Sequence, residues 1–119
     1  MNPVKLFSVG AVVAAIALAG PAWAHARLVS SNPASDATVS SPSTIRLTFS
    51  ERMVPAFSSF EVVSAAGSEQ AVRTAVSDDG RTLSGTPARP LAAGDYTVTW
   101  TIASSDGHRM TGSYGFTVR

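Results

Sequence analysis

The sequence contains no cysteine, and its one lysine, Lys5, lies close to the start of the chain. The absence of cysteine excludes disulfides, thiolate metal sites and thiol catalysis, so a small exported domain would be held together by packing alone. Eight acidic side chains face nine basic ones, and no basic patch indicates nucleic acid or anionic lipid as a partner. Histidine is also scarce, because only His25 and His108 occur.

The first 24 residues have the pattern of a cleavable signal peptide. Lys5 precedes an uncharged apolar run over residues 6–20, and Ala22 and Ala24 frame a small-x-small cleavage site. The run is shorter than the ~20 apolar residues that a membrane-spanning helix needs, which disfavours a permanent anchor. We therefore predict a signal peptide over residues 1–24, a mature domain over residues 25–119 that begins at His25, and no membrane insertion after cleavage.

Apolar and polar residues alternate with a period of two through most of the mature chain, which is typical of strands with one buried face. No helical period of useful length follows residue 24. The pattern predicts an all-β fold, an immunoglobulin-like antiparallel β-sandwich of about seven strands. The clearest strands are expected at residues 45–49, 60–63, 96–102 and 114–118, and weaker ones at 27–31, 71–76 and 81–86.

Two segments carry the local chemistry of such a sandwich. Residues 77–80 read Ser-Asp-Asp-Gly between two short strands, which predicts a hairpin turn with Gly80 at positive φ. Residues 91–96 resemble the tyrosine corner, in which the hydroxyl of a tyrosine, here Tyr96, bonds back to nearby backbone.

The two histidines suggest a metal site. Cleavage before His25 would leave a free α-amine beside its imidazole, and the two can chelate one ion. Asp106 and His108 are two positions apart, so on an extended chain they would point to the same face. The alternative is that they belong to a polar turn between two strands. An amine, two imidazoles and a carboxylate form a tetragonal N,O ligand set that suits Cu(II).

The mature sequence resembles the CopC family of bacterial periplasmic copper-binding proteins over nearly its whole length. The resemblance implies a Greek-key β-sandwich in the periplasm that binds one Cu(II) per chain through His25, Asp106 and His108. Glu51 matches a glutamate near the site in that family, which implies an outer partner of the ligands; otherwise it is an exposed carboxylate at a strand end. The matching stretches are HARLVSSNP at 25–33, LTFSE at 47–51, YTVTW at 96–100 and SDGHRMTGSYGFTV at 105–118.

The function that the resemblance implies is non-enzymatic: a periplasmic Cu(II) carrier or buffer in copper homeostasis and resistance, with an inner-membrane copper transport protein as a partner. Met53 and Met110 are the only methionines after the signal peptide, so no thioether cluster for Cu(I) is present. Two alternatives stay open. One is a copper-dependent oxidative enzyme with a histidine brace, and the other is a metal-free immunoglobulin-like interaction module.

Overall fold

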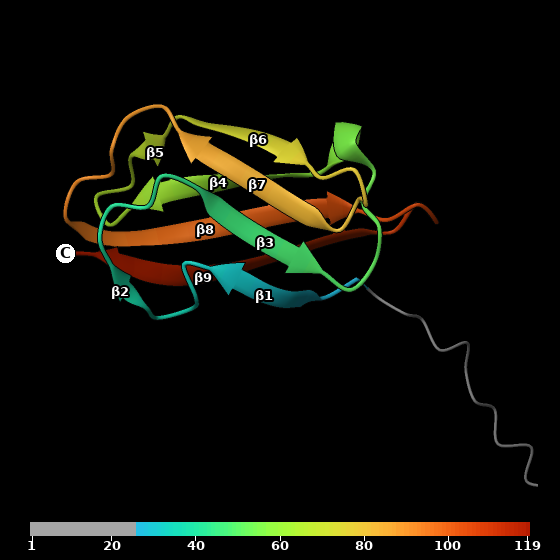
Figure 1. Ribbon diagram of the computed structural model, residues 1–119, viewed down its shortest axis with the longest axis horizontal. Coiled ribbons are helices and arrows are strands. Elements are labelled where there is room, and N and C mark those ends of the chain that lie inside the picture. Colours follow the sequence, from blue (N-terminus) through green and yellow to red (C-terminus); the bar gives the residue numbers. More distant parts are fainter. Residues whose placement is uncertain (1–25) are drawn as a thin grey trace, which may run out of the picture.

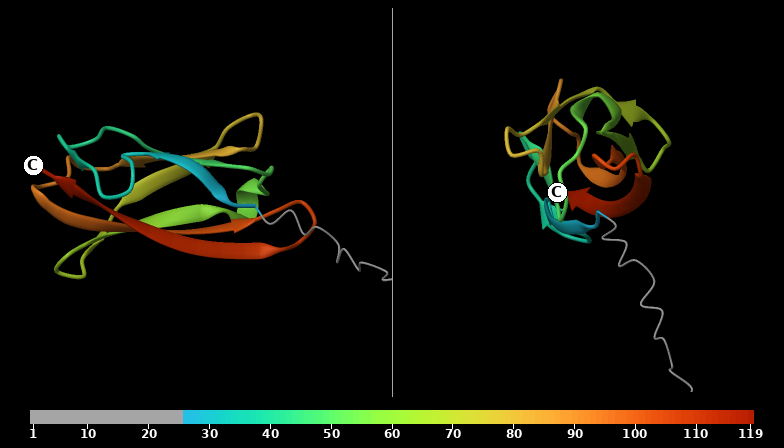
Figure 2. Two further views of the ribbon diagram at one scale, coloured as in Figure 1. Left: turned by 90° about the horizontal axis from the view of Figure 1, so that it is seen from below. Right: turned by 90° about the vertical axis from the view of Figure 1, so that its right-hand side faces the viewer.

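The structure is a computed structural model, and it describes residues 26–119. Its strands form two sheets that pack face to face (Figures 1 and 2). The four-stranded sheet has the order β1 (Leu28–Asn32), β3 (Ile45–Phe49), β7 (Thr82–Pro87), β6 (Val72–Val76). The five-stranded sheet has the order β2 (Thr38–Val39), β9 (Arg109–Val118), β8 (Gly94–Ala103), β4 (Ser59–Ser64), β5 (Glu69–Gln70).

The predicted immunoglobulin-like sandwich is confirmed. The two strand orders correspond to the ABED and GFC sheets of that fold, with β2 added in parallel beside β9 and β5 added beside β4. All seven expected strands are present, and the further two, β2 and β5, are only two residues long. Within residues 26–119 the only helix is the short 3-10 turn η1 (Pro55–Phe57), and no helix there is long and apolar enough to cross a membrane.

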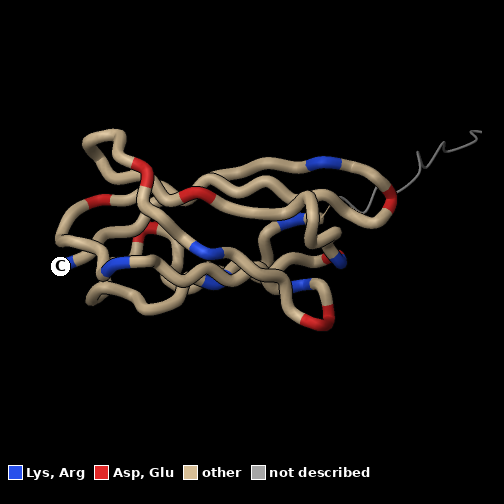
Figure 3. Tube along the Cα trace, turned by 90° about the horizontal axis from the view of Figure 1, so that it is seen from above, with Lys and Arg blue, Asp and Glu red and all other residues tan. Residues whose placement is uncertain are grey.

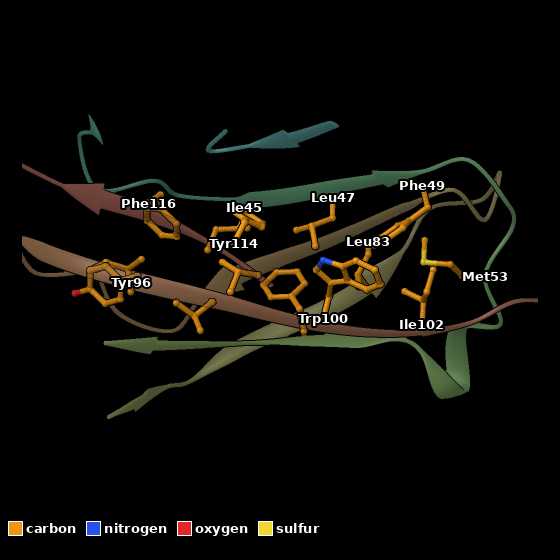
Figure 4. Packing of buried hydrophobic residues seen from close by; sticks show 14 of the residues in the cluster. Ile45, Leu47, Phe49, Met53, Leu83, Tyr96, Trp100, Ile102, Tyr114 and Phe116 are labelled. Atoms are coloured by element: carbon orange, nitrogen blue, oxygen red, sulfur yellow. The ribbon is translucent and has the colours of Figure 1, made fainter. Parts of the chain in front are cut away.

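The core lies between the sheets and consists of the inward residues of each alternating strand. Ile45, Leu47 and Phe49 of β3 are all buried, while Arg46 between them is exposed. The ring of Phe49 meets Trp100 of β8 edge to face, with centroids 5.0 Å apart (Figure 4). The period of two is therefore a direct consequence of one face of each strand packing into this layer.

The last strand is longer than its sequence suggests. Alternation predicted a strand that begins at Tyr114, but β9 begins at Arg109 and pairs with β8 along its whole length. The signal was missing because the inward residue opposite Trp100 is Gly112. A Cβ atom at Gly112 would lie 2.2 Å from the indole, so the space of a side chain is already filled by Trp100.

The long β8–β9 ladder determines where the histidine-bearing segment lies. At one end of the ladder Gly94 pairs with Val118, and near it the predicted tyrosine corner is confirmed, because the Tyr96 hydroxyl donates to the carbonyl of Ala92 at 2.7 Å. At the other end Ala103 pairs with Arg109. Residues 104–108 therefore form the tip between two paired strands at the far end of the sandwich (Figure 1).

Candidate metal centre

Residues 104–108 close the tip as a compact turn. The amide of Ser104 donates to the carbonyl of His108 at 2.9 Å, and the amide of Gly107 donates to the carbonyl of Ser104 at 3.0 Å. Gly107 has a φ of 88°, a backbone conformation that residues with a side chain rarely adopt. Backbone hydrogen bonds therefore contribute to the shape of this tip.

Asp106 and His108 contact each other within the turn. The Oδ2 atom of Asp106 lies 2.9 Å from Nδ1 of His108, and its Oδ1 atom accepts a hydrogen bond from the His108 amide at 3.0 Å. Both side chains are open to solvent, with 44% of the histidine and 58% of the aspartate exposed. A ligand arriving from solution can reach this pair without any rearrangement of the core.

Asp106 and His108 do not lie on an extended strand, as their spacing had predicted. On an extended chain the two side chains would lie on one face of a strand, whereas residues 105–107 turn and Gly107 takes a positive φ. The segment is a polar turn between two strands, and this leaves the predicted pairing of Asp106 with His108 intact. The turn does what the extended chain was expected to do, since it brings a carboxylate oxygen and a ring nitrogen together.

The turn also keeps Asp106 ionised. A hydrogen bond from the Ser104 hydroxyl is the largest cause that lowers the pKa of the Asp106 carboxyl far below its ordinary value, followed by the His108 amide and then the His108 ring. Each of these donors stabilises the charged form. Asp106 is therefore a carboxylate, the form that binds a metal, throughout the neutral and mildly acidic range.

His25 lies outside the described residues, but its neighbours show where the chain enters the sandwich. Ala26 is 2% exposed. The Arg27 amide donates to the Ser50 hydroxyl, and the Ser50 amide donates to the Arg27 carbonyl, both at 3.0 Å. The first described residues are thus tied to the end of β3, at the same end of the sandwich as the turn (Figure 1).

A short segment after β3 connects this entry point with the turn. Met53, three residues after Ser50, forms an isolated antiparallel bridge with Ser104. The next amide, that of Val54, donates to the Ala103 carbonyl at 2.8 Å. Met53 is 5% exposed and lies beside Ile102 in the core, as a strand-end packing residue would (Figure 4).

Glu51 belongs to the same segment. It follows Ser50 directly and is partly buried. Among residues 26–119 no group of three histidine, cysteine, aspartate or glutamate side chains is close enough to hold a metal. Within the described chain the predicted ligands that lie together are therefore Asp106 and His108, and a full site would need further donors.

The donors that are present fit a first-row metal ion. Two ligands about 2 Å from one ion and at right angles to each other lie about 2.8 Å apart. In this structure Nδ1 of His108 donates to Oδ2 of Asp106 at 2.9 Å, so the two atoms are spaced to hold one ion once the ring has lost that proton. One oxygen and one nitrogen, both accessible, suit Cu(II) better than a thioether or thiolate site would.

Ser104 is a polar residue of the site that the sequence argument missed. Its hydroxyl donates to Oδ1 of Asp106 and lies 3.3 Å from the His108 carbonyl oxygen. A serine two positions before an aspartate and three before a glycine is a pattern of tight turns. The same pattern occurs at residues 77–80, so it indicates a turn without indicating a metal site.

Comparison with known proteins gives consistent matches. A family model described as the CopC domain matches residues 28–119. Copper resistance protein C from Pseudomonas syringae pv. tomato is 43% identical over 123 residues, which cover 98% of this chain and 94% of that protein. Copper resistance protein C from Xanthomonas campestris pv. juglandis is 39% identical over 115 residues, 91% of each chain.

Solved structures agree with the fold. The crystal structure of PcoC, a methionine rich copper resistance protein from Escherichia coli, superposes with a TM-score of 0.75 at 38% identity and covers 81% of this chain and 100% of that one. The crystal structure of CopC from Methylosinus trichosporium OB3b superposes with a TM-score of 0.71 at 34% identity and covers 79% and 93%.

Proposed function

The chain belongs to the CopC family, and on that premise we propose that it is a periplasmic Cu(II) carrier or buffer in copper homeostasis and resistance. The copper resistance proteins that it resembles support copper as its cargo. The observation that carries the finer proposal is the 2.9 Å contact between Asp106 and His108 in an exposed turn. This pair offers two neighbouring positions on one ion.

The other two positions would be filled by His25. Its amine and imidazole can form a six-membered chelate once residues 1–24 are removed as a signal peptide. The burial of Ala26 and the hydrogen bonds of Arg27 support this, because they hold the start of the mature chain at the end of the sandwich where the turn lies. We assign one Cu(II) per chain to His25, Asp106 and His108, with Glu51 as an outer partner.

The donor set favours Cu(II) over Cu(I) and over zinc. Three nitrogens and one oxygen suit a tetragonal copper ion, and the Irving–Williams order places Cu(II) above Zn(II) for such ligands. PcoC is a methionine rich copper resistance protein, whereas this sequence has three methionines in all. Since Asp106 fills the fourth place around copper, the site leaves no open equatorial position for oxygen chemistry, which favours binding over oxidation.

Titration of the metal-free mature protein with Cu(II), followed by electron paramagnetic resonance and calorimetry, tests this proposal. We expect one ion per chain, a tetragonal spectrum with nitrogen and oxygen ligands, and no displacement by an equal concentration of zinc. Failure to bind copper would leave the metal-free interaction module. Copper-dependent oxidation of a polysaccharide by the pure protein would favour the histidine-brace enzyme.

The position of the chain start is tested separately. The intact mass of protein isolated from the periplasm should correspond to a chain that begins at His25, because Ala22 and Ala24 frame the cleavage site. A mature chain that begins at any other residue would remove the amine from the proposed ligand set. Once loaded, the protein would exchange copper with an inner-membrane copper transport protein as its partner.

A further inference from the structure

The Asp106 carboxylate has two oxygens, and the turn treats them differently. Oδ1 accepts hydrogen bonds from the Ser104 hydroxyl and from the His108 amide, while Oδ2 accepts from the His108 ring at 2.9 Å, a contact that a bound metal ion would replace. The two bonds to Oδ1 fix the plane of the carboxylate. Oδ2 is consequently the oxygen that is directed at the side where His108 presents its ring.

Ser104 is the residue on which this asymmetry depends. The His108 amide would approach Asp106 in any turn of this shape, since that bond involves backbone. The hydroxyl of Ser104 adds the second bond to Oδ1. The His108 carbonyl oxygen, 3.3 Å away, is a competing acceptor, but the hydroxyl has only one proton to donate. A charged acceptor takes that proton in preference to a carbonyl, because charge-assisted hydrogen bonds are the stronger ones.

We propose that Ser104 is a positioning residue that limits Asp106 to a single metal-binding oxygen, Oδ2. This inference rests on the proposed copper site. With Oδ1 held by two donors, the carboxylate contributes one ligand in the plane of the ion rather than two. A carboxylate that is free to rotate can bind through both oxygens, which adds a fifth donor and favours metals with less demand for a square plane.

The hairpin turn at residues 77–81 supplies a matched control. There the Ser77 hydroxyl donates to Oδ1 of Asp79, and the Arg81 amide donates to the same oxygen at 3.1 Å. Gly80 has a φ of 73°, so the backbone takes the same kind of turn. Because Arg81 replaces the histidine, a serine variant in this turn removes the same hydroxyl without touching the proposed ligands.

The experiment compares Ser104→Ala, Ser104→Thr and Ser77→Ala in the mature protein with Cu(II) as the probe. We expect Ser104→Ala to weaken Cu(II) binding by about tenfold, as the loss of an outer partner commonly does, and to change the paramagnetic resonance spectrum. Ser104→Thr should restore both, because Ser104 lies in a β-bridge where a β-branched residue fits. Ser77→Ala should change neither.

Nuclear magnetic resonance of the metal-free variants separates positioning from folding. The amides of Ser104 and Gly107 should keep their protection in Ser104→Ala, because their hydrogen bonds are to backbone. The ring nitrogen signals of His108 should shift, because Oδ2 of Asp106 is no longer held against Nδ1. Loss of amide protection, or failure of threonine to restore the spectrum, would overturn the inference in favour of a purely structural role.

The two proposals fail in different ways. If the unaltered protein takes up no copper, the proposed function fails, and the copper role of Ser104 fails with it. If the unaltered protein binds copper and Ser104→Ala binds it equally well with the same spectrum, the site stands and Ser104 has no part in it.

Discussion

The turns at residues 77–81 and 104–108 share the pattern Ser-x-Asp-Gly and nearly the same hydrogen bonds, but only the second ends in a histidine. In each turn a serine hydroxyl and a backbone amide bind one oxygen of the aspartate, and both hydrogen bonds lower the pKa of that carboxyl. Both contact the segment after β3, since the Met53 amide donates to the Gly80 carbonyl and Met53 bridges to Ser104. The Ser-x-Asp-Gly pattern therefore stabilises a turn and does not by itself indicate a metal site.

The difference shows what a metal site requires beyond a well-made turn. At residue 81 an arginine follows the glycine, and its charge helps to lower the pKa of the Asp79 carboxyl. At residue 108 an imidazole takes that place and contacts the carboxylate that the turn has already oriented. Acidic and basic residues are otherwise interspersed along the described part of the chain (Figure 3). A single residue converts a structural turn into a candidate ligand pair.

The largest effect on Cu(II) affinity should come from exchanging His108 and Arg81, the residues that end the two turns. We expect His108→Arg to lose far more Cu(II) affinity than the about 10–100-fold that an outer partner contributes, because a nitrogen ligand is replaced by a cation. Calorimetric titration and circular dichroism would measure affinity and fold. The reciprocal Arg81→His should add no second tight site, since one chain start supplies one amine. Two equally tight ions in Arg81→His would mean that an Asp-His pair suffices alone.

The second largest effect should distinguish the two aspartates by their contribution to Cu(II) affinity. Asp106→Asn keeps a side chain that suits the turn but replaces an anionic ligand with a neutral amide, so Cu(II) affinity should fall by more than the about tenfold expected of an outer partner such as Ser104. Asp79→Asn makes the same chemical change 27 positions earlier in the sequence and should leave copper affinity as it was. Equal losses in the two variants would attribute the effect to general destabilisation rather than to ligation.

The smallest expected effect is on the stability of the metal-free protein, and it should be similar for both turns. Both aspartates have a pKa below the ordinary value of ~3.9, so each contributes stability that is present above that pH and is lost as the pH falls through the lowered value. In metal-free protein, each asparagine variant should therefore unfold a few degrees lower at neutral pH, with a gap that narrows below about pH 4. Thermal unfolding from pH 7 to pH 2 measures this. A difference in unfolding temperature that stays the same at every pH would indicate lost packing instead of a lost charge.

Much of the fold could be predicted because it depends on local periodicity. Alternation located seven strands, and the glycine in the 77–80 segment located a hairpin turn. Strands β2 and β5 could not be found, because two residues have no period. The first half of β9 was hidden by Gly112, whose missing side chain makes sense only once Trp100 is known to lie against it.

The candidate site was less accessible to such reasoning. The sequence indicated Asp106 and His108 as a pair, but it could not distinguish their turn from that of Asp79 except by the histidine. The link from the chain start to the turn runs through Ser50 and Met53, whose contacts join residues far apart in sequence. The scarcity of histidine suggested a site shared by His25 and the turn, and the resemblance to a copper-binding family strengthened that suggestion. Ser104 gave no signal beyond that of an ordinary turn residue.

The chain start provides the most direct test of a copper ion shared by His25 and the turn. One additional methionine before His25 converts its amine into an amide, which keeps its proton at neutral pH and ligates poorly. The fold should not change, because Ala26 and Arg27 keep their contacts. We predict that this extended form loses much of its Cu(II) affinity and gives a different paramagnetic resonance spectrum from the form that begins at His25. Equal affinity and identical spectra, with both forms folded, would contradict a site that uses the N-terminal amine.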